Sequence, residues 1–154
     1  MIRALESKLA RPDAPRNINP LCVMLEDPDD PHLPFAPGTV SNEPASADKR
    51  PRQRYDVVLS HLVLHHIPDM TAFLTTMFGC LKSGGRIAVT DFEDFGPAAR
   101  KFHPESKMEG VERHGIPKAE IEDILNNIGF VNVKVEVGWT MRKEIEAWPG
   151  EWGE

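Results

Sequence analysis

The sequence lacks the glycine-rich turn by which dinucleotide-binding domains hold a phosphate. Its first glycine is Gly38, and the pattern GxGxxG occurs nowhere in the 154 residues. A dinucleotide-binding domain needs that turn because it lets the backbone approach the pyrophosphate closely. The sequence therefore argues against a domain that binds NAD.

Cysteine, long apolar runs and excess basic charge are also scarce. The two cysteines, Cys22 and Cys80, lie among apolar residues, and we interpret them as small buried hydrophobes. No apolar run approaches the ~20 residues of a membrane span, and we find no secretory signal. A net charge of -6 argues against nucleic acid or an anionic membrane as the main partner. We expect one cytoplasmic domain over residues 1–154, with no nucleic-acid or membrane partner.

The chain is organised around residues 55–91. A short apolar run, Val57 to Leu59, is typical of a strand buried on both faces of a parallel sheet. Asp69 is placed to cap a helix whose apolar residues recur at steps of three and four up to Leu81. Gly84 has the residue type that ends a helix in the left-handed conformation, and the run from 87 to 89 predicts the next strand. Strand, helix and strand in this order predict a parallel pair with a right-handed crossover.

Polar residues follow both predicted strands. Ser60 and His61 come after the first strand, and Asp91 comes after the second. In open parallel sheets ligands bind outside the carboxyl ends of the strands. We therefore expect the chemistry of this protein at Ser60, His61 and Asp91.

The flanking segments complete an α/β pattern. The spacing of apolar residues predicts a helix over the first nine residues and another after Pro117 that ends at Gly129. A short apolar run, 21–25, predicts a third buried strand that ends at Glu26 and Asp27. Alternating valines over 131–137 predict a half-buried strand, with an antiparallel partner over 139–145. Residues 37–54 are rich in proline and poor in apolar residues, which favours a disordered insertion loop within the domain.

Four of these motifs together resemble the second half of a class I S-adenosylmethionine-dependent methyltransferase. They are the strand from Tyr55 to Ser60, the LHHIPD run at 64–69, the LKSGGR turn at 81–86 and the strand that ends in Asp91. The likeness is to the small-molecule enzymes related to ubiquinone and menaquinone biosynthesis. It implies a Rossmann-like sheet, S-adenosylmethionine as cofactor and a small-molecule acceptor that no motif identifies.

The resemblance also assigns cofactor contacts. Glu26 or Asp27 takes the position of the acid that binds the adenine amino group, although a solvated acidic turn explains both residues equally well. Ser60 and His61 line the cofactor pocket. In the family the glycine loop follows the first strand and an acid that holds the ribose ends the second, and this sequence contains neither.

The missing parts lead to three hypotheses. The first is a partial methyltransferase sheet without its first two strands, with a carboxyl-terminal antiparallel hairpin: an amino-truncated enzyme that binds its cofactor weakly or not at all and whose activity alone is doubtful. The second is a non-catalytic binding protein that pairs through its exposed sheet edge with a partner chain. The third is an incomplete sequence of a longer gene product.

Methyl transfer to oxygen or nitrogen needs in-line positioning and a base. The candidates for catalysis are His65, His66 and Asp91, because histidine titrates near neutrality; a structural role for the histidine pair is the alternative. A metal site is a rival use of His61 and His65, whose spacing of four suits one helical face, with Asp69 a turn further on. The zinc-helix glutamate is absent between them, so we predict no metal.

Overall fold

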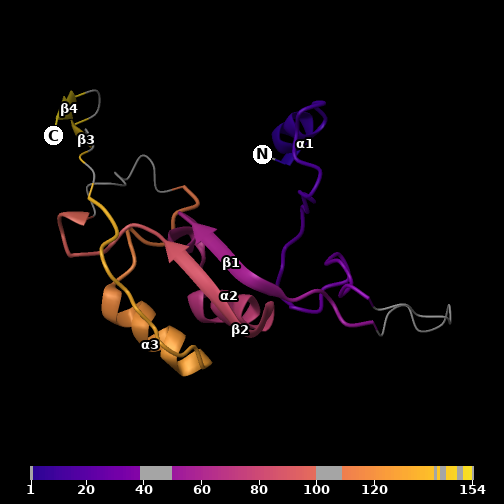
Figure 1. Ribbon diagram of the computed structural model, residues 1–154. Coiled ribbons are helices and arrows are strands. Elements are labelled where there is room, and N and C mark those ends of the chain that lie inside the picture. The colour runs from indigo at the N-terminus through magenta and orange to yellow at the C-terminus, as the bar shows by residue number, and fades with distance from the viewer. Residues whose placement is uncertain are drawn as a thin grey trace. The chain divides into compact units, whose positions relative to one another are not determined.

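The computed structural model describes residues 2–38, 50–99, 109–140, 142, 145–148 and 151–153. Its contacts group into two compact units, Met1–Gln53 and Arg54–Glu154, where the sequence suggested one domain. Figure 1 follows the chain through both units. Each unit is described by itself.

The amino-terminal unit begins with the predicted helix, α1 (Ile2–Leu9), none of whose residues is buried. The strand predicted over 21–25 is wrong, because residues 18–27 have no regular secondary structure. Met24 is 81% exposed, and Cys22 is exposed rather than buried. A short apolar run forms a strand only where a neighbouring strand completes its backbone hydrogen bonds, and among the described residues this run has no such neighbour.

Further along, the same unit is closed by an antiparallel bridge between Phe35 and Arg52. The backbone N–H of Gln53 donates to the carbonyl of Pro34 at 2.8 Å. The Arg52 side chain is buried, donates to the carbonyl of Leu33 at 3.1 Å and lies over the Phe35 ring. The two ends of the predicted insertion loop therefore meet in an ordered contact, whereas residues 39–49 lie outside the described residues.

The carboxyl-terminal unit is built on a parallel pair of strands, as predicted. Strand β1 (Tyr55–His61) pairs with β2 (Leu81–Thr90), and the register sets Val58 beside Ile87 and His61 beside Thr90. Between the strands the chain passes through a 3-10 turn, η2 (Leu64–His66), and helix α2 (Met70–Gly79).

Helix α2 begins and ends for local reasons. The Asp69 side chain accepts a hydrogen bond from the backbone N–H of Ala72 at 2.8 Å, which confirms the predicted cap. The helix ends at Gly79, so Leu81 already belongs to β2. Gly84 is left-handed, with φ 75°, but it forms an irregular start to β2 and does not close the helix. At Gly85 a Cβ atom would lie 3.0 Å from the Tyr55 carbonyl oxygen, so a side chain there would push the strands apart.

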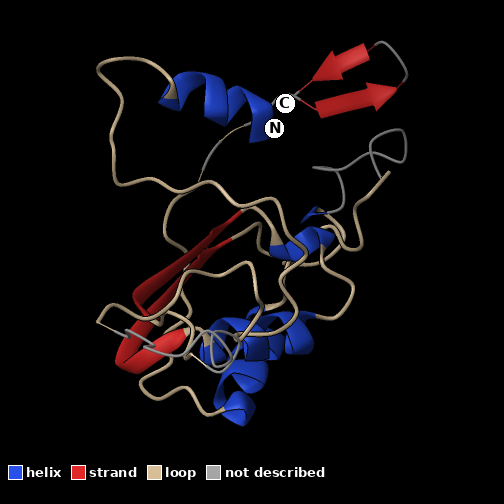
Figure 2. Cartoon of the chain, turned by 90° about the vertical axis from the view of Figure 1, so that its right-hand side faces the viewer, coloured by secondary structure: helices blue, strands red, loops and turns tan. Residues whose placement is uncertain are grey.

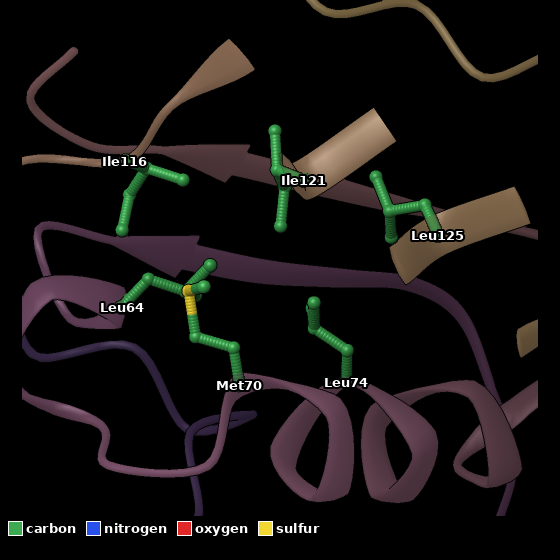
Figure 3. Packing of buried hydrophobic residues seen from close by; sticks show 6 residues of the cluster. All are labelled: Leu64, Met70, Leu74, Ile116, Ile121 and Leu125. Atoms are coloured by element: carbon green, nitrogen blue, oxygen red, sulfur yellow. The ribbon is translucent and has the colours of Figure 1, made fainter. Parts of the chain in front are cut away.

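The core of this unit lies on one face of the strand pair. Helix α3 (Lys118–Ile128) begins after Pro117 and ends at left-handed Gly129, as predicted. Helices α2 and α3 lie on the same side of the strands (Figure 2). Figure 3 shows side chains from η2, from both helices and from the segment before α3 converging between them. The buried cluster is Leu64, Met70, Leu74, Ile116, Ile121 and Leu125, with Ile87 and Val89 of β2 packed against it.

The other face of the strand pair is exposed, so the expectation of a strand buried on both faces is wrong. Val57 and Leu59 are 53% and 75% exposed, whereas Val58 and Ser60 between and after them face the core side. Among the described residues of this unit, no helix or strand covers this face, which a parallel sheet normally buries. The hypotheses of missing strands predicted an exposed edge of the sheet at β1 and not an exposed face.

The strand predicted over 131–137 is also wrong, and residues 141, 143 and 144 of its predicted partner lie outside the described residues. Residues 131–140 contain no strand, although Val133 and Val135 pack on the core while Val131 is 82% exposed. Only the two middle valines of the alternating pattern therefore pack on the core, since Val137 is 62% exposed, and no described strand pairs with this segment. Further on, the short segments β3 (Ile145–Trp148) and β4 (Glu151–Gly153) pair antiparallel.

The core makes a direct prediction about stability. Leu74 is fully buried in the cluster, and its replacement by alanine removes packed methyl groups and leaves a cavity. We expect Leu74→Ala to lower the free energy of unfolding by about 2–5 kcal/mol. Leu59→Ala, on the open face of the same unit, is the matched control and changes it by less than about 0.5 kcal/mol. Urea denaturation measures both, and equal losses would contradict the assignment of the core to one face.

Candidate active site

The carboxyl ends of β1 and β2 bring the predicted polar residues together. The register sets Ser60 beside Val89 and His61 beside Thr90. His61 Nδ1 and Thr90 Oγ1 form a side-chain hydrogen bond across the two strands. Because parallel strands end at the same edge of a sheet, the order of strands in the sequence predicted that Ser60, His61 and Asp91 gather at this edge.

A sharp turn then carries the chain back toward β2. Leu62 has a left-handed backbone, with φ 53°, which is rare for a bulky residue. Its N–H donates to the carbonyl of Thr90 at 2.8 Å, which ties the turn to the end of β2. The 3-10 turn η2 follows directly and buries His65. This strained connection is what places His65 near Asp91.

His65 and Asp91 form a buried pair. His65 Nδ1 lies 2.7 Å from Asp91 Oδ1, and the two side chains are 4% and 3% exposed. The backbone N–H of Phe92 donates to the same carboxylate at 2.7 Å, and that of His65 donates to it at 3.3 Å. An ionised carboxylate only accepts hydrogen bonds, so Nδ1 carries the proton in this pair. The orientation and tautomer of the imidazole are therefore set by Asp91.

Ser60 presents a buried polar atom that has no partner among the described residues. Its side chain is 8% exposed, and Oγ makes no hydrogen bond to any described residue. A buried hydroxyl in this state costs about 1–3 kcal/mol. It lies at the carboxyl end of β1, where a ligand of a parallel sheet binds. The hydroxyl is therefore a candidate contact for a bound molecule.

The structure separates the two predicted catalytic histidines. His66 is exposed, and its Nδ1 interacts with the backbone carbonyl of Gly110, although the two rings lie 4.0 Å apart. Only His65 reaches Asp91.

The acidic residues assigned to adenine lie in the amino-terminal unit. Glu26 and Asp27 are exposed. Asp27 Oδ1 accepts the N–H of Asp29 at 2.8 Å, which is the Asx-turn geometry of a solvated acidic turn. Asp27 thus has the geometry of a solvated acidic turn, which was the alternative to the adenine contact. The adenine contact stays a prediction.

The arrangement removes the premise of the metal hypothesis. His61 belongs to β1 and His65 to η2, so their spacing does not put them on one helical face. Within the described ranges, no group of three or more histidine, cysteine or acidic side chains is arranged to hold a metal ion. In the same part of the chain no helix has both the length and the apolarity to cross a membrane.

Two contacts at this site were not predicted. Thr90 holds His61, and Arg113 donates from its guanidinium to backbone carbonyls of the turn that carries His65. The polar residue at the end of β2 offered a signal for Thr90. Nothing in the sequence near Arg113 pointed to a turn so distant in the chain.

The resolved pKa shift in this unit lies far from the site along β1. The hydrogen bond from Lys82, at 2.8 Å, lowers the pKa of the Asp56 carboxyl below its ordinary value of 3.8. The Asp56 side chain is 80% exposed, so solvent screens this pair and its contribution to stability is small.

Comparison with known proteins gives a family match and two relatives. A family model described as a methyltransferase domain matches residues 12–135. The chain is 34% identical over 94 residues to phosphoethanolamine N-methyltransferase 2 of Caenorhabditis elegans, covering 59% of this chain and 21% of that protein. It is 29% identical over 87 residues to phosphoethanolamine N-methyltransferase of Triticum aestivum, covering 56% and 17%. The chain thus spans about a fifth of these relatives. No solved structure matches significantly.

The contrast between Asp91 and Asp56 tests the buried pair. Asp91→Ala leaves the buried His65 N–H groups and the Phe92 N–H without their acceptor, and we expect it to lower the free energy of unfolding by about 1.5–3 kcal/mol. Asp56→Ala removes an equally short but exposed contact and serves as the control, with no change beyond experimental scatter. Urea midpoints at neutral pH measure both. A loss no larger for Asp91→Ala than for Asp56→Ala would show that the His65 contact is not a buried interaction.

Proposed function

We propose that this chain transfers a methyl group from S-adenosylmethionine to a small molecule, because it belongs to the methyltransferase domain family. The observation that carries the proposal is the buried His65–Asp91 pair beside the carboxyl ends of two parallel strands. The family generally uses S-adenosylmethionine. When bound, it supplies the methyl group as an electrophilic sulfonium substituent.

Ser60 is the residue of this unit that best fits the cofactor. Its buried Oγ has no partner among the described residues, and a polar ligand group would satisfy it. His61 follows Ser60 at the end of β1 and is hydrogen-bonded to Thr90, and its contact with the cofactor is part of the proposal. The match between protein and cofactor is argued only for the carboxyl ends of β1 and β2. Glu26 and Asp27 belong to the other unit, and their contact with adenine is part of the proposal.

His65 is the proposed base. Asp91 engages Nδ1, so we assign proton transfer to Nε2. Asp91 fixes the ring in orientation and stabilises the positive charge that forms when the ring takes a proton. The deep burial of the pair means that proton transfer takes place away from bulk water, where oriented groups interact most strongly.

We propose phosphoethanolamine as the first acceptor to test, since both relatives are named for it. The amine nitrogen forms a bond to the methyl carbon as the bond from that carbon to sulfur breaks, and the nitrogen gives up a proton. His65 would accept that proton. The likeness to ubiquinone and menaquinone enzymes remains a prediction, and a phenolic acceptor is the corresponding control substrate.

We expect the isolated chain to bind the cofactor weakly, with a dissociation constant above the micromolar range. The sequence has no glycine-rich turn, and the open face of β1 leaves one side of the sheet in water. Isothermal titration with S-adenosylmethionine and with its demethylated product measures this affinity. Tight, stoichiometric binding would contradict the expectation of weak affinity but support the proposed function.

Loss of the base tests the role of His65. Methyl transfer from labelled S-adenosylmethionine to phosphoethanolamine, followed with excess protein, should fall by roughly 10²–10⁴-fold in His65→Asn, the range of general base catalysis. His32→Asn is the matched control, because that ring is 67% exposed and lies in the other unit. Equal rates in the wild type and His65→Asn would refute the base. The absence of transfer to every acceptor, together with no binding of the cofactor, would refute the function.

Ser60→Ala gives a test with two opposite effects. Removal of the orphaned hydroxyl should leave the free protein unchanged or slightly more stable, because no protein hydrogen bond is lost. The same change should weaken cofactor binding by about 0.5–1.5 kcal/mol, the net worth of one hydrogen bond. Ser83→Ala, at an exposed position of β2, is the control for both measurements. Reduced stability without reduced binding would assign Ser60 to the structure alone.

A second candidate function is non-catalytic pairing with a partner chain through the sheet edge, and it is favoured by β1, which has a described strand on one of its edges only. Light scattering of the purified chain after size-exclusion chromatography distinguishes the two. A monodisperse complex with another polypeptide, without methyl transfer, supports the second candidate. A monomer that transfers methyl groups supports the first.

A further inference from the structure

The Arg113 guanidinium is aimed at the backbone of the turn that carries His65. Nη1 donates to the carbonyls of Leu64 at 2.8 Å and Ile67 at 2.7 Å, and Nη2 donates to that of Pro68 at 3.1 Å. Three carbonyls therefore share one planar, rigid group of donors. Guanidinium suits this arrangement because its N–H groups lie in a fixed fork.

The backbone beside Arg113 holds the same turn. The N–H groups of Glu112 and Arg113 both donate to the carbonyl of His65, at 2.9 and 3.2 Å. The ring of His66 interacts with the carbonyl of Gly110. The segment 110–113 thus contacts the backbone of His65, while Asp91 contacts its ring. His65 is held from two directions by parts of the chain that are distant in sequence.

The turn over residues 62–68 needs hydrogen bonds from other segments because it makes few within itself. It enters through the left-handed residue Leu62, and η2 has three residues with no side-chain cap at Val63. A 3-10 turn of this length has poor hydrogen-bond geometry. Arg113 supplies donors to carbonyls along the turn up to Pro68, the residue before the cap of α2.

The segment itself is anchored to the end of β2. Glu93 and Ile116 form a parallel bridge, and the N–H of Ile116 donates to the carbonyl of Phe92 at 2.8 Å. The approach is close because a Cβ on Gly115 would lie 2.7 Å from the backbone nitrogen of Asp94. Both supports of His65, Asp91 and Arg113, are therefore fixed to the same strand extension.

We propose that Arg113 is a positioning residue that holds the His65 imidazole against Asp91 by fixing the backbone of residues 64–68. The proposal rests on the function proposed above, and it assigns Arg113 no contact with substrate or cofactor. A lysine keeps the charge but has no planar fork, so it replaces Arg113 only in part.

The first test reads the imidazole directly and needs no activity. Long-range proton–nitrogen NMR spectra report the Nδ1 proton of His65, assigned by its disappearance in His65→Asn. In Arg113→Ala we expect this proton to lose its protection from exchange with water and its signal to shift toward that of an exposed histidine. Arg113→Lys should show a smaller change. Arg86→Ala, at an exposed position of β2, should leave the signal unchanged.

The second test separates positioning from general loss of structure. Arg113→Ala should lower kcat by about 10²-fold, the effect of a misplaced catalytic group, with little change in the KM for S-adenosylmethionine. Added methylguanidinium should restore part of the rate in Arg113→Ala and none in His65→Asn. A fall in kcat with no recovery and an unchanged His65 signal would overturn the proposal.

The outcomes also separate this proposal from the proposed function. An altered His65 signal in Arg113→Ala, with no methyl transfer by the wild type, upholds the positioning of the ring and refutes the function. An unchanged His65 signal, together with methyl transfer at the wild-type rate in every Arg113 variant, refutes the positioning role of Arg113 and upholds the proposed function. Should Arg113→Ala fail to fold by circular dichroism, Arg113→Lys decides: a His65 signal identical to that of the wild type overturns the proposal, and a partial shift supports it.

Discussion

The parallel pairing of β1 with β2 is the constraint on which the rest of the carboxyl-terminal unit depends. Its register sets His61 beside Thr90, so the polar residues after each strand emerge at one edge. A slip of one residue would turn Ser60 away from the core side and Val57 and Leu59 into it. The apolar face presented by Val58, Ile87 and Val89 to the helices fixes the register, and the site follows from that packing.

Once the edge is fixed, the chain must reverse within a few residues to reach α2. Leu62 accepts an unfavourable backbone conformation, and the short turn after it buries an imidazole. These two costs are offset locally by a hydrogen bond that the ring donates to Asp91 and by hydrogen bonds that Arg113 donates to the turn. A buried polar network of this kind specifies one arrangement only while each member keeps its partner. The Ser60 hydroxyl, at the end of β1, makes no hydrogen bond with a described residue and so stays outside this network.

The sequence predicted the elements whose causes are local and missed those that need a distant neighbour. Asp69, Pro117 and Gly129 mark helix ends by their own chemistry, and the strand–helix–strand order implies the parallel pairing. Residues 21–25 and 131–137 carry strand-like patterns, but no described strand pairs with either segment, so neither forms a ladder. In the site, the strand ends predicted that Ser60, His61 and Asp91 lie at one edge, whereas the contact of His65 with Asp91 was not predicted. The exposed position of His66 and the contacts of Arg113 with the turn depend on tertiary packing, which leaves no local pattern in the sequence.

The distribution of burial explains why the chemistry is assigned to one side of the sheet. Helices α2 and α3 cover the face that bears Ser60, and the residues that hold His65 come from the same side. The opposite face exposes Val57 and Leu59 to water, where a charged or polar group gains little from orientation because solvent screens it. A base that must be oriented before it reacts therefore belongs on the covered side. His65 meets that requirement and the exposed His66 and His61 do not, so the choice among the histidines follows from burial rather than from residue type.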